Sequence, residues 1–237
     1  WVGNNDVLEA ASLGLADENY PYTDPNDFKD DLTAIINELT NSTVAPIFIA
    51  NIFDITDLPY FTSLPSSVTI GGNKTYLFGE DKNGIRQLTD DDLVLFWALP
   101  DYLNLKKSGD ISQATALNDT LILDVEEKAE IQSIIDQYND IITTIINSDD
   151  QLYLVDMYSI YKNISENGYT LNGVNYTAEL IYFDESGNLS LNLLTTLFSY
   201  DALHPNKFGY ASFANSFIAV INSSLNASLP LVTFSDL

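Results

Sequence analysis

The sequence predicts an α/β fold in which helices pack against a parallel sheet. Two short, continuous apolar runs, 44–49 and 152–155, have the composition of buried strands in such a sheet. Between them, 124–147 carries one wide apolar face at helical spacing. Strand-like and helix-like segments alternate along the chain, and 237 residues with 46% apolar content suffice for one core. We therefore expect one domain spanning 1–237.

The amino-terminal quarter provides the first elements. Residues 1–2 form an apolar stub typical of a strand end, and the Gly-Asn-Asn-Asp run at 3–6 indicates a turn after it. Residues 7–16 are rich in alanine and leucine and indicate a short helix. Asn26 or Asp27 is expected to cap a helix that continues to about residue 40. This capping function is favoured over calcium binding, because the loop lacks the glycine and final glutamate of an EF-hand.

The middle and end of the chain follow the same logic. Residues 58–88 contain prolines, paired glycines and an Asn-Gly turn, which predict an inserted hairpin region or lid. Thr89, with Asp92 three positions on, predicts the start of a helix. Residues 168–187 are expected to form hairpins, with turns at Asn172-Gly173 and Ser186-Gly187. The last helix is expected over 207–225.

Charge and composition exclude several classes of function. The formal net charge is −25 and Lys plus Arg total 9, so the surface repels nucleic-acid phosphates and we expect no nucleic-acid partner. The absence of cysteine excludes a disulfide scaffold, a thiolate zinc site and a cysteine nucleophile. The single histidine, His204, excludes a histidine-rich metal site. No apolar run is long enough to cross a bilayer.

One local pattern carries the chemistry of a general base. Pro205 disfavours helical geometry for His204, so the imidazole is expected on a loop. Asp201 lies three residues earlier, and a tight turn lets its carboxylate reach the Nδ1–H of His204. This contact orients the base in a serine triad. A lone histidine beside proline is also often structural, so the pattern gains weight only together with the Gly-Asn-Asn-Asp turn at the other end of the chain.

Together these motifs resemble the SGNH, or GDSL-type, hydrolase family. Gly3-Asn4-Asn5-Asp6 matches its Gly-x-Asn-Asp block, which makes Asn5 the counterpart of the oxyanion asparagine, supported by Gly3 and Asp6. Asp201 and His204 match its Asp-x-x-His block, although Ala202 stands where the family often has glycine. The resemblance implies a three-layer, flavodoxin-like parallel sheet with helices on both faces. It also implies an ester hydrolase that needs no metal or organic cofactor.

The nucleophile of that family has no match in this chain. No Gly-Asp-Ser and no Gly-x-Ser-x-Gly pattern occurs, and the family's second glycine block is also missing. We therefore expect that the same protein has a segment upstream of Gly3, with two strands and the serine. This segment is either a separate, cleaved fragment that remains docked or a stretch of the same chain that lies outside residues 1–237. Without those strands the parallel sheet would expose an apolar edge. The chain by itself is predicted to be inactive.

Three functions remain open at this level. The first is hydrolysis of a small-molecule, lipid or carbohydrate ester by a secreted, periplasmic or outer-surface enzyme, since the resemblance is closest to bacterial secreted or lipoprotein members. The second is a non-catalytic module that binds a glycan or a protein on the same scaffold, which the missing serine favours. The third is acyl transfer to an alcohol, which uses the same triad.

Overall fold

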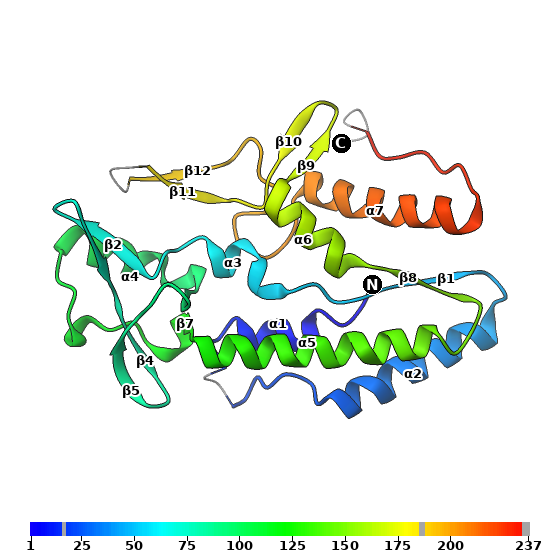
Figure 1. Ribbon diagram of the computed structural model, residues 1–237, viewed down its shortest axis with the longest axis horizontal. Helices are drawn as coiled ribbons and strands as arrows, with labels where there is room; N and C mark the ends of the chain where they lie inside the picture. The colour runs from blue at the N-terminus through cyan, green and yellow to red at the C-terminus, as the bar shows by residue number, and fades with distance from the viewer. Residues whose placement is uncertain (16–17, 185–187, 234–237) are drawn as a thin grey trace.

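A computed structural model describes residues 1–15, 18–184 and 188–233 and has a mixed α/β architecture (Figure 1). Its α-helices are α1 (Asn5–Ala11), α2 (Pro25–Ser42), α3 (Pro59–Thr62), α4 (Leu99–Ser108), α5 (Val125–Ile146), α6 (Met157–Asn167) and α7 (Lys207–Leu225). Its strands are β1 (Ile47–Ala50), β2 (Ser67–Ile70), β3 (Asn73–Tyr76), β4 (Phe78–Asp81), β5 (Gly84–Gln87), β6 (Leu93–Val94), β7 (Ile122–Leu123), β8 (Leu152–Val155), β9 (Tyr169–Leu171), β10 (Val174–Tyr176), β11 (Ile181–Phe183) and β12 (Leu189–Leu191).

The centre of the molecule is the parallel pair β1–β8, in which Ile47 lies opposite Leu152 and Ala50 opposite Val155. Helices α1, α2 and α5 lie on one side of this pair, and α6 and α7 lie on the other (Figure 1). Both strands were predicted, and the α/β class is confirmed. Within the described residues, however, the parallel sheet has only these two strands, and the other pairs are antiparallel. The larger parallel sheet is therefore not observed.

The prediction of a strand end at Trp1-Val2 is wrong for the described chain, because neither residue is in a strand. The indole of Trp1 instead packs edge-on against Phe53 and Phe213, with ring centroids 5.7 and 5.6 Å away. No described strand lies beside residues 1–2 to supply ladder hydrogen bonds. The ring contacts with Phe53 and Phe213 instead pack Trp1 against the rest of the chain.

Helix α5 forms where its pattern predicted it. The carboxylate of Asp124 accepts the N–H groups of Glu126 and Glu127, and the Glu127 carboxylate accepts the N–H of Asp124 at 2.8 Å. This reciprocal capping box satisfies donors that the first turn leaves unpaired. Farther along, the Asn139 amide bonds both the N–H and the C=O of Ile52, each at 2.8 Å. Helix α5 thus provides hydrogen-bond partners for the backbone N–H and C=O groups just after β1. Its buried face comprises Ile131, Ile134, Ile135, Tyr138 and Ile142.

Residues 59–123 form a second unit, here called the hairpin module. The hairpins β2–β3 and β4–β5 lie where hairpins were predicted within 58–88, including the turn before Gly84. That this region is an insertion or a lid stays a prediction. The module continues beyond that range through α4 and the β6–β7 pair. It has its own apolar cluster, which includes Leu64, Val68, Leu77, Leu88, Val94, Tyr102 and Ile122.

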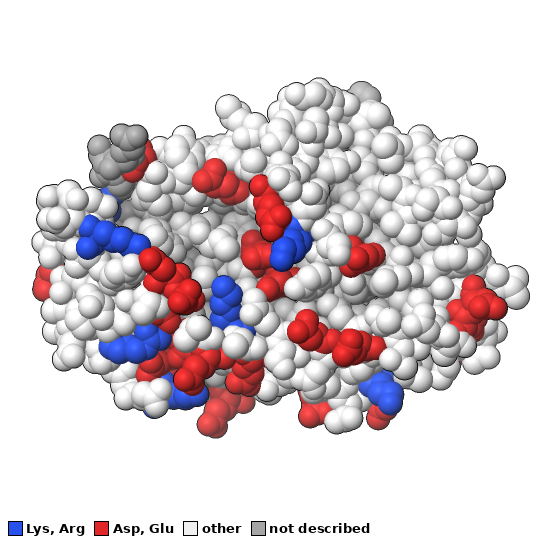
Figure 2. All heavy atoms as spheres, viewed as in Figure 1, with Lys and Arg blue, Asp and Glu red and all other residues white. Residues whose placement is uncertain are grey.

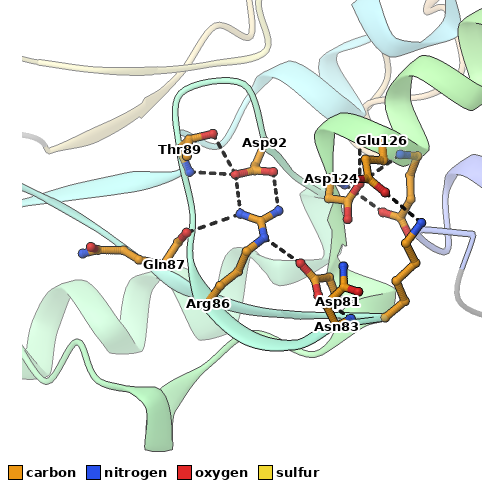
Figure 3. A network of polar contacts seen from close by, with 10 residues as sticks. Asp81, Asn83, Arg86, Gln87, Thr89, Asp92, Asp124 and Glu126 are labelled. Atoms are coloured by element: carbon orange, nitrogen blue, oxygen red, sulfur yellow. Dashed lines mark hydrogen bonds and ion pairs between the residues drawn. The ribbon is translucent and has the colours of Figure 1, made fainter.

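Arg86 is the centre of a polar network that stabilises the hairpin module (Figure 3). Its guanidinium donates to Asp92 at 2.7 and 2.9 Å and to Asp81 at 2.6 Å. Asp92 also accepts the N–H and hydroxyl of Thr89. Burial, the largest effect, raises the pKa of Asp92, but Arg86 and Thr89 outweigh it and the pKa falls below its usual value. The predicted helix at Thr89 is wrong, because Asp92 closes a turn onto Arg86 instead of capping a helix.

The junction between the hairpin module and α5 carries a carboxyl that is reluctant to ionise. Burial, followed by the charges of Asp124 and Asp119, raises the pKa of Glu127 to about 7. The folded protein therefore holds this proton more tightly than the unfolded chain, and stability is lost as pH rises from about 4.5 to about 7. Glu127→Gln should then stabilise the protein above pH 7 by about 1 kcal/mol, a value reduced for partial exposure.

Chemical denaturation at pH 4 and pH 8 measures this effect. The advantage of Glu127→Gln should vanish at pH 4, where the carboxyl is protonated in both states. The neighbouring Glu126→Gln is the matched control, because it removes only an exposed ion pair with Lys82 and should change stability little. A gain that is the same at both pH values would contradict the assignment.

The remaining elements agree with the sequence pattern in type and differ in detail. Helix α2 is capped by Asp24, whose carboxylate accepts the N–H of Asn26 at 2.8 Å, instead of by Asn26 or Asp27. The turn at Asn172-Gly173 is confirmed between β9 and β10, whereas Ser186-Gly187 lies outside the described residues. Helix α7 has the predicted bounds.

The charged side chains are unevenly distributed over the surface. On the face drawn in Figure 2, acidic and basic groups gather over the hairpin module and α5, whereas the area over α7 and β9–β10 is almost free of them. Helix α7 nevertheless is no membrane span: among the described helices, none is long and apolar enough to cross a bilayer.

Candidate functional site

His204 lies on a closed loop between β12 and α7. Phe198 and Pro205 form a β-bridge at its base, and the Ser199 N–H donates to the His204 carbonyl at 2.8 Å. Ala202 adopts a left-handed conformation with φ of 63° and is fully buried. A left-handed residue is costly for a side chain with a Cβ, so the packing around Ala202 holds the tight turn. The turn brings Asp201 back toward His204.

Asp201 and His204 form the contact that their spacing predicted. His204 Nδ1 lies 2.8 Å from Asp201 Oδ2, and Asp201 Oδ1 accepts the N–H groups of His204 and Leu203 at 2.9 and 3.0 Å. Burial raises the pKa of Asp201, but these hydrogen bonds outweigh it and hold the pKa below its usual value. An ionised Asp201 favours the tautomer with the proton on Nδ1. Nε2 makes no hydrogen bond within the described residues and can accept a proton.

Asn5 is the first residue of α1, and its neighbours explain how it is held. Gly3 has φ of +108°, a conformation that residues with a Cβ rarely adopt, and a Cβ there would also lie 2.9 Å from Ile52 Cδ1, so this position favours glycine. Asp6 accepts the hydroxyl of Thr23 at 2.8 Å, which ties α1 to the loop before α2. The exposed Asn5 side chain makes no hydrogen bond within the described part of the chain. Gly3 and Asp6 thus fix the start of α1, and the side-chain amide of Asn5 has no hydrogen-bond partner among the described residues.

Asn5 and His204 come from opposite ends of the chain and line one pocket. This pocket has a volume of about 380 Å³ and a mainly apolar wall. Asn4 also lines the pocket, and its Oδ1 is buried without a hydrogen-bond partner among the described residues. Asp201 supports the pocket from behind His204 without lining it. The apolar and aromatic lining residues are Trp1, Leu8, Phe53, Ile55, Leu58, Phe198, Leu203, Pro205, Tyr210, Phe213, Ala214 and Phe217.

Tyr60, at the start of α3, links the two halves of this site. Its N–H donates to the carbonyl of Ala202 at 3.0 Å, and its hydroxyl donates to the carbonyl of Ser12 at 2.8 Å. The first bond anchors the His204 loop, and the second anchors the end of α1, the helix that begins with Asn5. Tyr60 is fully buried, and burial raises its pKa. No sequence signal distinguishes such a bridging tyrosine from an ordinary core residue.

Among the described residues, no serine or threonine lines the pocket. The Ser12 hydroxyl donates to the Glu9 carbonyl instead. Within the described residues, no group of three or more His, Asp or Glu side chains could hold a metal ion. No family model, no curated protein and no solved structure matches this chain. Its function therefore has to be inferred from the residues of this pocket.

Proposed function

We propose that the chain supplies the base, the orienting carboxylate and an oxyanion donor of a serine-dependent carboxylic ester hydrolase of the SGNH (GDSL) type. The observation that carries the proposal is the 2.8 Å contact between Asp201 and His204 beside a pocket that also receives Asn5. A base with a fixed tautomer and an amide donor near it are the two supports that a serine nucleophile needs. Neither requires a metal or an organic cofactor.

The proposed chemistry proceeds in two halves. A serine hydroxyl attacks the ester carbonyl while His204 Nε2 takes its proton, and the Asn5 amide donates a hydrogen bond to the oxyanion. Collapse of this intermediate breaks the ester C–O bond, and His204 returns the proton to the leaving alcohol. Water then attacks the acyl-serine with the same base and releases the acid. If an alcohol replaces this water, the same site performs acyl transfer.

The serine is proposed to reside on a segment outside residues 1–237. Beside β8, the N–H of Ile47 donates to the carbonyl of Gln151, just before the strand, and the N–H of Asn51 donates to the carbonyl of Val155. Along a parallel strand, the backbone N–H and C=O groups of successive residues point to alternate edges. Those of Phe48 and Ala50 therefore point to the edge of β1 opposite β8, where no described strand pairs. A parallel strand on this edge would lie beside β1, and the chain after β1 continues to Phe53 and Ile55 in the wall of the pocket. Such a strand would extend the sheet toward the three-layer, flavodoxin-like fold.

A non-catalytic binding module is the second candidate, and it is favoured because no serine or threonine is found among the described residues that line the pocket. Treatment of the native gene product with a fluorophosphonate probe distinguishes the two. A labelled serine together with hydrolysis of short p-nitrophenyl esters supports the enzyme. No label and no hydrolysis would overturn the enzyme and leave the binding module. A secreted, periplasmic or outer-surface location belongs to the same proposal and rests on the family resemblance.

Substitution of Asn5 tests the oxyanion assignment. Asn5→Ala should lower turnover of a p-nitrophenyl ester by about a hundredfold or more, because one preorganised donor to the oxyanion is lost. The fold should persist, since the Asn5 side chain makes no hydrogen bond within the described residues. Asn37→Ala, at an exposed position of α2, is the matched control and should keep full activity. Wild-type turnover of Asn5→Ala would remove Asn5 from the mechanism.

A further inference from the structure

A second cavity lies between α3, the end of α6 and the segment that leads into β11. It has a volume of about 340 Å³, within the range of ligand pockets. Among the described residues, the walls of this cavity and of the His204 pocket share no member. Figure 2 shows acidic side chains gathered where α3 and the end of α6 meet. The cavity is therefore a separate candidate site on an acidic part of the surface.

Ser63, just after α3, places a buried polar group without a partner in the wall of this cavity. The residue is only 8% exposed, and its hydroxyl oxygen is buried without a hydrogen-bond partner among the described residues. Its backbone is fixed, because its N–H donates to the carbonyl of Pro59 at 2.9 Å. Buried polar groups are nearly always hydrogen-bonded. An unpaired hydroxyl in the wall of a cavity therefore indicates that a bound polar group completes it.

Three carboxylates line the same cavity, those of Asp57, Glu166 and Glu179. None of them makes a side-chain hydrogen bond or an ion pair within the part of the chain that the structure describes. Burial is the largest effect on Asp57 and raises its pKa. Lys128 and Lys162 oppose this shift, but neither lysine lines the cavity. The described wall thus carries several negative charges and no lysine or arginine.

Two further hydroxyls in the wall can only accept a hydrogen bond from a ligand. The Thr62 hydroxyl donates to the Leu58 carbonyl at 3.1 Å, and the Ser165 hydroxyl donates to the Lys162 carbonyl at 2.9 Å. A hydroxyl has one hydrogen, so each of these groups keeps only its lone pairs for a ligand. The cavity therefore fits a ligand that is rich in donors and positively charged.

We infer that this cavity binds a short aliphatic polyamine. Its ammonium groups would donate charge-assisted hydrogen bonds to the carboxylates and a hydrogen bond to the Ser63 hydroxyl. Its methylene groups would pack on Ala178 and Ile181, which are buried apolar residues of the wall. A neutral sugar would leave the carboxylate charges uncompensated, and the same charges repel a phosphate. The inference stands independently of the proposed ester hydrolysis.

The test measures binding of spermidine to the native gene product by calorimetry. A salt concentration of about 150 mM screens non-specific attraction to the acidic surface. We expect millimolar or tighter binding of spermidine and no binding of 1,8-octanediol, a neutral chain of similar length. Glu166→Gln/Glu179→Gln should weaken the binding of spermidine about tenfold or more, because two charge-assisted hydrogen bonds are lost.

Two further variants separate recognition from net charge and from folding. Glu38→Gln/Asp150→Asn is the matched control, because it removes two carboxylates at exposed positions of α2 and of the loop before β8. It should bind spermidine as the wild type does. Ser63→Ala should weaken binding about threefold or more. It should not lower the melting temperature of the free protein, because the Ser63 hydroxyl has no partner among the described residues.

A backbone amide NMR titration locates the bound spermidine. The shifts should be concentrated in residues 57–63, 165–166 and 178–181. Shifts spread evenly over the acidic surface, equal losses of affinity in the two double variants, or equal binding of octanediol would overturn the inference. Absence of spermidine binding would do the same. Ester hydrolysis is not part of this readout, so its failure would be visible separately.

Discussion

Asp201→Asn is expected to reduce ester turnover of the native gene product by about 10⁴-fold. Asparagine keeps the oxygen that accepts the N–H groups of His204 and Leu203, so the loop should keep its shape. It replaces the oxygen that faces His204 Nδ1 with an N–H donor. The imidazole must then carry its proton on Nε2, where it cannot accept one from serine. Turnover is therefore expected to fall because the tautomer of His204 changes, while the fold stays the same.

The single histidine allows the tautomer to be measured directly. The ¹⁵N spectrum of the imidazole contains only His204 signals, and they should move from the Nδ1–H to the Nε2–H tautomer in Asp201→Asn. This measurement needs no nucleophile, so the chain alone suffices. Asp150→Asn, at an exposed loop position, is the control and should change neither the tautomer nor turnover. A flipped tautomer with unchanged turnover would exclude His204 as the base.

Gly209→Ala is expected to destabilise the fold by about 3 kcal/mol, the upper end for overpacking. A Cβ at this position in α7 would lie 2.2 Å from the Leu197 carbonyl oxygen and 2.8 Å from Pro205 Cβ. The Leu197 carbonyl cannot move freely, because it also accepts the N–H of Asn206. To relieve this clash, α7 would have to move away from the extended segment that contains Leu197, and this movement would also displace His204. Urea unfolding measures the free energy, and the ¹⁵N spectrum reports the displacement.

Gly173→Ala is the matched control for the glycine effect. Gly173 has φ of +81° and open space around its Cβ position, so alanine costs only the left-handed backbone, about 1 kcal/mol. If Gly209→Ala and Gly173→Ala lower the free energy of unfolding equally, α7 can move away from Leu197. The clash at Gly209 would then not determine the position of the His204 loop.

Interactions between near neighbours in the chain were predictable. The capping box of Asp124 with Glu127 and the amphipathic period define α5, and the three-residue spacing of Asp201 and His204 with Pro205 defines their contact. Thr89 and Asp92 show the limit of such reasoning. Their spacing fits a capping box, but the Arg86 guanidinium takes the Asp92 carboxylate, and a turn forms instead.

The amino-acid sequence by itself determined the α/β class, the long helices α5 and α7, and the pairing of Asp201 with His204. These depend on periodicity, capping and short loop closure, which act within a few residues. Only the tertiary structure decided that Asn5 shares a pocket with His204. It also decided that Tyr60 connects α1, which begins with Asn5, to the loop that carries His204. Such contacts join distant parts of the chain, and their geometry depends on how all the helices pack around β1 and β8.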